Sequence, residues 1–130
     1  FDDKVLADWN GLMIAALATL RRAGRCVAVA SNFDSRLPAL LVGLGLAGDL
    51  DLIWLPRDAG VAKPDPRFFR SACDRLGVAP AQAVAVGDDP EQDLAAARRA
   101  GLRAIDVTSL ASLDALPGRI DALEREENPD

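Results

Sequence analysis

The pattern of apolar and polar residues along the chain predicts short strands that alternate with helices. Apolar runs of strand length occur at residues 25–31, 51–55, 83–86 and 103–107. Helical patterns occur at residues 35–46, 66–77, 89–101 and 109–116. The stretch 56–66 is expected to be a loop. Strands that alternate with helices form βαβ units, so we predict an α/β fold with a parallel sheet of about four strands.

The N-terminal residues 9–22 also have a helical pattern, but their apolar side chains do not fit a single stripe. These side chains are Trp9, Leu12, Met13, Ile14, Leu17 and Leu20. A helix that is apolar on nearly every side requires burial on more than one face. We therefore expect residues 1–22 to be an apolar helical segment used for dimerisation. Residues 23–120 would form the α/β core, and residues 121–130 a frayed acidic tail.

The composition indicates one folded domain without nucleic-acid or membrane partners. Of the 130 residues, 50% are hydrophobic, which is enough for a core. The formal net charge of −5 argues against a nucleic-acid partner, because phosphate backbones attract basic surfaces. No apolar run approaches the roughly 20 residues that span a bilayer, and the N-terminus lacks the features of a signal peptide. We expect a cytoplasmic protein.

Cysteine and histidine usage narrows the possible chemistry. Cys26 and Cys73 lie in apolar runs and are expected to be buried free thiols in a reducing compartment. The chain contains no histidine, which excludes His-based triads and HExxH zinc sites. Catalysis would have to use carboxylates, lysine, arginine, hydroxyls or a metal.

Polar residues follow three of the predicted strands. Ser31-Asn32 follow the first strand, Lys63 lies in the loop after the second, and Asp88-Asp89 follow the third. Ligands of open parallel α/β sheets bind beyond the carboxyl ends of the strands. Lysine and hydrogen-bond donors neutralise phosphate oxygens, while carboxylates hold a hard cation. The sequence therefore predicts a site for a phosphate group and a divalent metal.

Three segments carry a resemblance to a known family: VAVASNFDSRLPALLVGLGL, GVAKPDPRFF and AVAVGDDPEQDLAAARRAGLRAI. In this order, over residues 17–107, they resemble the haloacid dehalogenase-like hydrolases, a superfamily made up largely of phosphatases. The resemblance implies a three-layer, Rossmann-like fold. It also implies roles for individual residues. Ser31 and Asn32 would bind the transferring phosphoryl group, Lys63 would neutralise the phosphate, Asp88 would ligate Mg²⁺, and Asp89 and Asp93 would complete the metal site.

Simpler roles are open for several of these residues. Asp65 and Asp89 each precede a proline at a helix start, where an aspartate N-cap is favoured. Asp93 lies in a first helical turn, where negative charge is favoured by the helix dipole. Ser31 or Asp34 is an alternative cap for the helix at 35–46, and Lys63 alone fits a solvated loop lysine.

The family's nucleophile has no clear counterpart. Members of the family carry it on a first strand that ends in DxDx(T/V) and usually lies at the centre of the sheet. The start FDDKVLADWNG has no apolar strand ahead of its acids, and Lys4 takes the place of the second aspartate. We therefore expect a sheet without its usual first central strand, with Asp2 or Asp3 as outside candidates for base or ligand. Residues 2–18 instead resemble a segment of thioredoxin-like/six-hairpin glycosidase-type proteins, which suggests a fusion.

Two main functions are consistent with this sequence. The first is a phosphoric ester hydrolase with Mg²⁺ or Mn²⁺ that acts on phosphodiesters or activated phosphomonoesters. Its catalytic residues would be Lys63, Asp88 and Asp89, and metal-activated water would replace the aspartyl-phosphate intermediate. The second is an inactive remnant that binds phosphate, metal or a protein partner. A third hypothesis is that the chain is a fragment whose first strand comes from elsewhere.

A missing central strand also has a structural consequence. Strands 25–31 and 83–86 would have unpaired backbone groups, each costing about 1–3 kcal/mol when buried. The chain must pair these strands directly, insert its N-terminal segment or borrow from another copy. We expect a homodimer formed through the N-terminal helix and the sheet edge.

Overall fold

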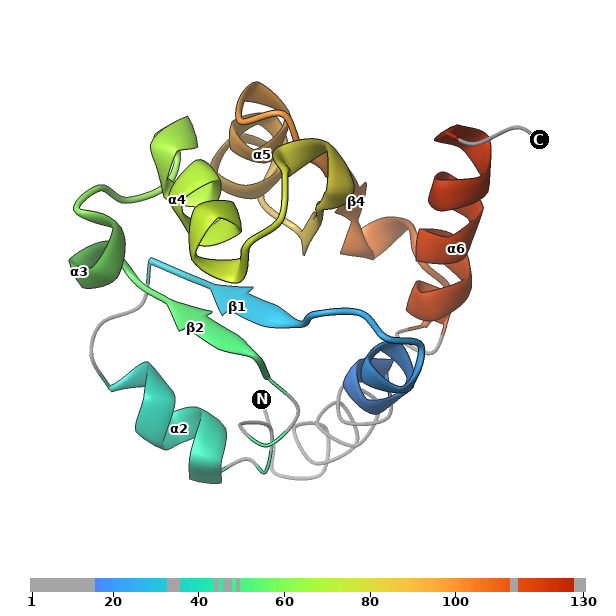
Figure 1. Cartoon of the computed structure of the whole chain (residues 1–130), viewed down its shortest axis with the longest axis horizontal. Coiled ribbons are helices and arrows are strands. Elements are labelled where there is room, and N and C mark those ends of the chain that lie inside the picture. Colours follow the sequence, from blue (N-terminus) through green and yellow to red (C-terminus); the bar gives the residue numbers. More distant parts are fainter. Residues whose placement is uncertain are drawn as a thin grey trace.

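The structure is a computed structural model, and it describes residues 16–32, 36–43, 45, 48, 50–112 and 115–127. Its strands form two separate pairs, and each pair is parallel (Figure 1). The pairs are β1 (Ala28–Ala30) with β2 (Leu52–Trp54) and β3 (Val84–Gly87) with β4 (Arg103–Asp106). Val29 lies opposite Ile53, and Ala85 lies opposite Ala104. Within the described residues, no strand pairing joins β1 to β3.

Helices and short helical turns connect the strands. They are the helical residues 16–22, α2 (Leu37–Gly43), α3 (Pro56–Ala59), α4 (Pro66–Leu76), η2 (Pro80–Gln82), the π-helix η3 (Pro90–Ala95), α5 (Ala96–Arg99), η4 (Val107–Ser109) and α6 (Leu116–Glu127). α4 begins with the expected aspartate cap, because the Asp65 side chain accepts a hydrogen bond from the Arg67 backbone N–H. It ends at Gly77, whose φ of 75° is the left-handed conformation that glycine favours.

Helices cover both faces of the strands, in the expected three-layer arrangement (Figure 1). Neighbouring residues of a strand point to opposite faces, and Ala85 and Val84 pack against different buried clusters. The first cluster consists of Phe69, Cys73, Ala96, Ala97, Ala100 and Leu102. The second consists of Leu20, Val27, Ile105, Leu116 and Ile120. Ala30 at the end of β1 also packs against the first cluster. β1 and β3 therefore share one core, although no ladder of hydrogen bonds joins them in the part of the chain that the structure describes.

The predicted α/β fold with parallel strands is confirmed, and all four predicted strands are present. Three of them are shorter than expected, and β3 has the expected length but is shifted by one residue. In the described residues they form two pairs instead of the expected single sheet of about four strands. The prediction of a loop at residues 56–66 is wrong for its first part, because Pro56–Ala59 form the helix α3. Pro56 starts this helix, and the Asp58 side chain accepts a hydrogen bond from the backbone N–H of Leu55 at 3.0 Å. A proline at the first helical position and the cap from the Asp58 side chain both favour a helical turn here.

The C-terminal part also differs from the expectation. The short helix expected around 109–116 is replaced by η4 and by α6, which continues to Glu127, within the stretch expected to fray. Leu116 and Ile120 lie one turn apart on α6 and are both buried. The Arg25 guanidinium contacts the carboxylates of Asp121 at 2.8 Å and Glu124 at 2.6 Å. Apolar burial and these ion pairs hold α6 against the core.

One of the two cysteines lies where the sequence suggests. Cys73 is buried, and this burial raises the pKa of its thiol. Cys26 is exposed, so the expectation of two buried thiols was wrong. Its neighbour Val27 packs into the core, and adjacent residues in an extended segment point in opposite directions.

Several expectations concern residues outside the described part of the chain. These residues are the N-terminal stretch 1–15, which includes Asp2 and Asp3, and residues 33–35, which include Asp34. Among the residues that the structure does describe, no helix has the length and apolar character needed to cross a membrane.

Candidate active site

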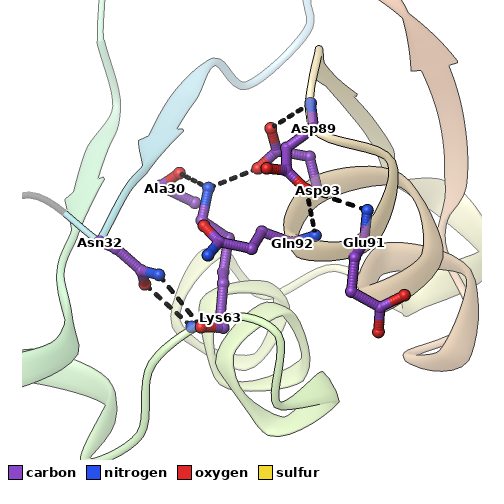
Figure 2. A network of polar contacts seen from close by, with 7 residues as sticks. All are labelled: Ala30, Asn32, Lys63, Asp89, Glu91, Gln92 and Asp93. Atoms are coloured by element: carbon purple, nitrogen blue, oxygen red, sulfur yellow. Dashed lines mark hydrogen bonds and ion pairs between the residues drawn. The ribbon is translucent and has the colours of Figure 1, made fainter.

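The carboxyl ends of β1 and β3 carry most of the polar residues that the sequence selects. We call six residues the strand-end site: Ser31, Asn32, Lys63, Asp88, Asp89 and Asp93. Two of them directly follow β1 and two directly follow β3, while the lysine comes from the loop between α3 and α4. Four of them belong to one network of polar contacts, which Figure 2 shows around the lysine. Ser31 and Asp88 each precede a member of this network in the chain.

Lys63 is at the centre of the network. Its ammonium nitrogen lies 2.6 Å from Asp93 Oδ1 and donates to the Ala30 carbonyl at 3.2 Å. The two charged side chains are only 11% and 17% exposed. The simpler interpretation of Lys63 as a solvated loop lysine is therefore wrong. An ammonium has three donors, so these two contacts leave one N–H for a further acceptor.

Asn32 contacts the main chain of Lys63 with both ends of its amide. Its Oδ1 accepts from the Lys63 backbone N–H at 2.9 Å, and its Nδ2 donates to the Lys63 carbonyl at 3.0 Å. Ser31 is half-buried, and its own backbone N–H donates to the Trp54 carbonyl, which extends the β1–β2 ladder by one residue.

Gly87 makes room for Asp93. A Cβ at position 87 would lie 2.6 Å from Asp93 Oδ2 and 2.7 Å from its Cβ, distances that real contacts do not reach. The same Oδ2 accepts from the Asp89 backbone N–H at 3.2 Å. Sequence reasoning did not assign Gly87 a role, although a glycine at a strand end signals close approach of another group.

Asp89 caps the helix that follows it. Its Oδ1 accepts from the backbone N–H groups of Glu91 at 3.0 Å and Gln92 at 2.8 Å (Figure 2). The capping alternative for Asp89 is therefore confirmed. Asp93 sits inside the π-helix η3, a helix type often found at functional sites, and its main partner is Lys63.

Asp88 differs from the other two aspartates. It is exposed, and within the described part of the chain no hydrogen bond or ion pair occupies its carboxylate. Together the site has one positive and three negative side chains, so its formal charge is negative. An anionic substrate would be repelled here unless a cation joined the site.

The donor set suits a hard divalent cation, because it consists of carboxylate oxygens without histidine or cysteine. Asp88 is the carboxylate with its oxygens available. In the described ranges, no group of three or more acidic, Cys or His side chains converges closely enough to hold a metal ion. The three-carboxylate site expected from the sequence is thus not assembled as such, and Asp89 and Asp93 already have protein partners.

A cavity of about 240 Å³ lies elsewhere, toward the amino ends of the strands. Its lining includes Arg25, Val84, Arg103 and Glu124, of which Val84 and Arg103 are the first residues of β3 and β4. The strand-end site is at the other ends of these strands and does not belong to this cavity.

Comparison with known proteins identifies the family to which the chain is related. A family model described as haloacid dehalogenase-like hydrolase matches residues 3–101. A phosphoserine phosphatase from Thermus thermophilus is 45% identical over 92 residues, which is 70% of this chain and 37% of the relative. A glyceraldehyde 3-phosphate phosphatase from Methanopyrus kandleri is 36% identical over 91 residues, which is 69% of this chain and 39% of that relative.

Solved structures give the same result. The crystal structure of a HAD phosphatase from Thermococcus onnurineus superposes with a TM-score of 0.69 at 31% identity. The match covers 72% of this chain and 43% of that one. The chain therefore spans less than half of the length of these relatives.

Proposed function

Because the chain belongs to the haloacid dehalogenase-like hydrolase family, we propose that it is a phosphoester hydrolase that acts on small phosphate esters at the strand-end site. The observation that carries this proposal is the shielded Lys63–Asp93 pair beside the end of β1, which leaves one ammonium N–H for a phosphate oxygen. The names of two relatives, a phosphoserine phosphatase and a glyceraldehyde 3-phosphate phosphatase, fit this chemistry.

A divalent cation, Mg²⁺ or Mn²⁺, is part of the proposal. Asp88 would hold it through a carboxylate oxygen, with Asp89 and Asp93 in the outer part of the site. When bound, such an ion offsets the negative charge of the site and activates water toward phosphorus. The roles of the protein are then to bind and orient the ester, with Lys63 and the Ser31 hydroxyl directed at phosphate oxygens.

We propose direct attack by water rather than an aspartyl-phosphate intermediate. The basis of this proposal is that Lys4 stands where the family pattern has its second aspartate. Phosphodiesters and activated monoesters suit this route, because they need less charge neutralisation or have a better leaving group.

An inactive remnant that binds phosphate, metal or a partner is the second candidate. It is favoured by the two aspartates that already have protein partners, because Asp89 caps η3 and Asp93 binds Lys63. A remnant would keep the Lys63–Asp93 pair and show no turnover.

We also propose that the chain forms a homodimer. β1 and β3 pack in one core without a shared ladder in the described residues, and Val86 of β3 is 39% exposed. Unpaired strand edges are the usual site of strand addition between chains. Size-exclusion chromatography with light scattering tests this, and a monomer at micromolar concentration would contradict it. A cytoplasmic location and the lack of a nucleic-acid partner stay predictions from composition.

The function is tested by hydrolysis of p-nitrophenyl phosphate and bis(p-nitrophenyl) phosphate with and without added Mg²⁺ or Mn²⁺. We expect metal-dependent turnover that falls about 100-fold or more in Asp88→Asn, the scale of losing one electrostatic contact to the transition state. Asp74→Asn, the same change at an exposed position of α4, should have no effect. Absence of turnover with every metal would favour the remnant, and equal rates in Asp88→Asn would exclude Asp88 as the metal ligand.

A further inference from the structure

We propose that Asn32 is a positioning residue that fixes Lys63 through its main chain, and is not a ligand of the phosphate group. The family resemblance assigned Asn32 to phosphate binding. The structure instead shows both ends of its amide on the peptide groups that flank the Lys63 Cα, at 2.9 Å and 3.0 Å (Figure 2). The inference rests on the proposed function only for the nature of the substrate.

The hydrogen-bonding capacity of an amide supports this assignment. Its oxygen accepts and its nitrogen has two N–H donors. The Lys63 N–H takes the oxygen, and the Lys63 carbonyl takes one donor, which fixes which way the amide is turned. The pairing with the Lys63 main chain thus accounts for the amide oxygen and for one of the two N–H donors.

The end of β1 holds Lys63 at two separate points. Asn32 holds the backbone, and the Ala30 carbonyl, two residues earlier, accepts from the ammonium group at 3.2 Å. The side chain of Lys63 thus returns to the same strand that binds its main chain. Asp93 completes the arrangement from η3 at 2.6 Å.

Such an arrangement matters because Lys63 lies in a connection rather than in a helix or strand. α3 ends at Ala59 and α4 begins at Pro66, so the lysine lies in the loop between these two helices. A loop residue pays the entropy of ordering when it binds substrate, unless the protein orders it beforehand. Asn32 supplies that order, so its loss should be felt through Lys63 and not at the phosphate itself.

A double-mutant cycle separates the two roles. Asn32→Ala should lower kcat/KM by about 10–100-fold, as expected when a catalytic group is slightly misplaced. In a Lys63→Ala background the same substitution should change kcat/KM less than about twofold, because residues that act as a unit are not additive. An equal loss in both backgrounds would show that Asn32 touches the substrate directly and would overturn the proposal. Gln92→Ala, an exposed amide near the same network, is the matched control.

A second measurement does not depend on activity. Hydrogen exchange of the Lys63 backbone amide, followed by NMR, should accelerate about tenfold or more in Asn32→Ala, because its acceptor is lost. Asn32→Asp keeps an acceptor for the Lys63 N–H but places its second oxygen against the Lys63 carbonyl, so its exchange rate should lie between those of the wild type and Asn32→Ala. The Phe68 amide, which donates to the Asp65 carbonyl at 3.0 Å, should exchange at the same rate in all variants.

Unchanged protection of Lys63 in Asn32→Ala would refute the positioning role whatever the enzyme does. Faster exchange of the Lys63 amide in Asn32→Ala, together with no hydrolysis of any ester by the wild type, would refute the proposed function and leave the positioning role intact.

Discussion

Two groups of charged residues lie at opposite ends of the strands, and they are built differently. At the carboxyl ends, Lys63 and Asp93 form a pair whose side chains are 11% and 17% exposed, and main-chain groups of Ala30 and Asp89 bind the same two side chains. Near the amino end of β1, Arg25 binds Asp121 and Glu124, whose side chains are 52% and 57% exposed.

The difference indicates what each group does. A shielded pair with main-chain contacts has a fixed geometry and strong local fields, which suits a binding site. Arg25 is 28% exposed and its two carboxylate partners on α6 are more than half exposed, so these ion pairs are partly screened by water and salt. Their main effect is on stability. Charge alone does not separate the two regions, whereas burial and main-chain contacts do.

The substitution with the largest expected effect is Gly87→Ala. The added Cβ would collide with Asp93, so we expect a loss of about 1–3 kcal/mol of unfolding free energy, as for overpacked sites. Phosphoesterase activity should fall about 100-fold because the Lys63–Asp93 pair moves. Urea denaturation and kinetics measure the two effects. Gly118→Ala is the matched control, since no heavy atom lies within 4 Å of its added Cβ. Unchanged activity in Gly87→Ala would show that the pair need not be fixed.

The second substitution removes one partner of the shielded pair. Asp93→Asn leaves the Lys63 ammonium without its countercharge and should lower the unfolding free energy by about 1–3 kcal/mol. The double variant Lys63→Met/Asp93→Asn should lose less than the two single changes combined. Glu91→Gln, in the exposed pair with Arg99, should leave stability unchanged within error. Additive losses would contradict the coupling that the geometry implies.

The third substitution acts on the other group. Arg25→Ala should lower the unfolding free energy by about 1 kcal/mol, and added salt should reduce this difference. Side-chain hydrogen bonds to Asp121 and Glu124 raise the pKa of Arg25, so its charge persists at any working pH. Activity and phosphate affinity should stay at the wild-type level. A large loss of either would assign the Arg25 group a functional role.

The smallest effect is expected at the start of α4. Hydrogen bonds from Arg67 lower the pKa of Asp65 below its ordinary value. A lowered pKa in the folded state stabilises the protein above the unfolded-state pKa, about 3.9, and this contribution disappears as the pH falls through the lower folded value. Asp65→Asn keeps a good N-cap but removes the titration. Thermal unfolding followed against pH should show a shallower acid slope in this variant, and an identical slope would contradict the assignment.

Periodicity was sufficient to predict the α/β class and the positions of the strands. It also placed Ser31, Asn32, Lys63, Asp88 and Asp89 near strand ends, because parallel strands bring their carboxyl ends to one side. The N-cap roles of Asp65 and Asp89 followed from the proline that comes after each of them.

The partners of these side chains could not be predicted. Asn32 meets the Lys63 main chain, and Lys63 meets Asp93, across 31 and 30 residues of sequence. Such pairings depend on how strands and loops pack, which a local pattern does not encode. α6 was missed for a similar reason, because the acidic residues that suggested a frayed tail are held by Arg25.

Binding of inorganic phosphate in the presence of Mg²⁺, measured by isothermal titration calorimetry, tests the central claim most directly. The account predicts that Lys63→Ala weakens phosphate binding about tenfold or more, the loss of a charge-assisted contact, while Arg25→Ala binds like the wild type. Equal affinity in Lys63→Ala and the wild type, or a loss confined to Arg25→Ala, would contradict it.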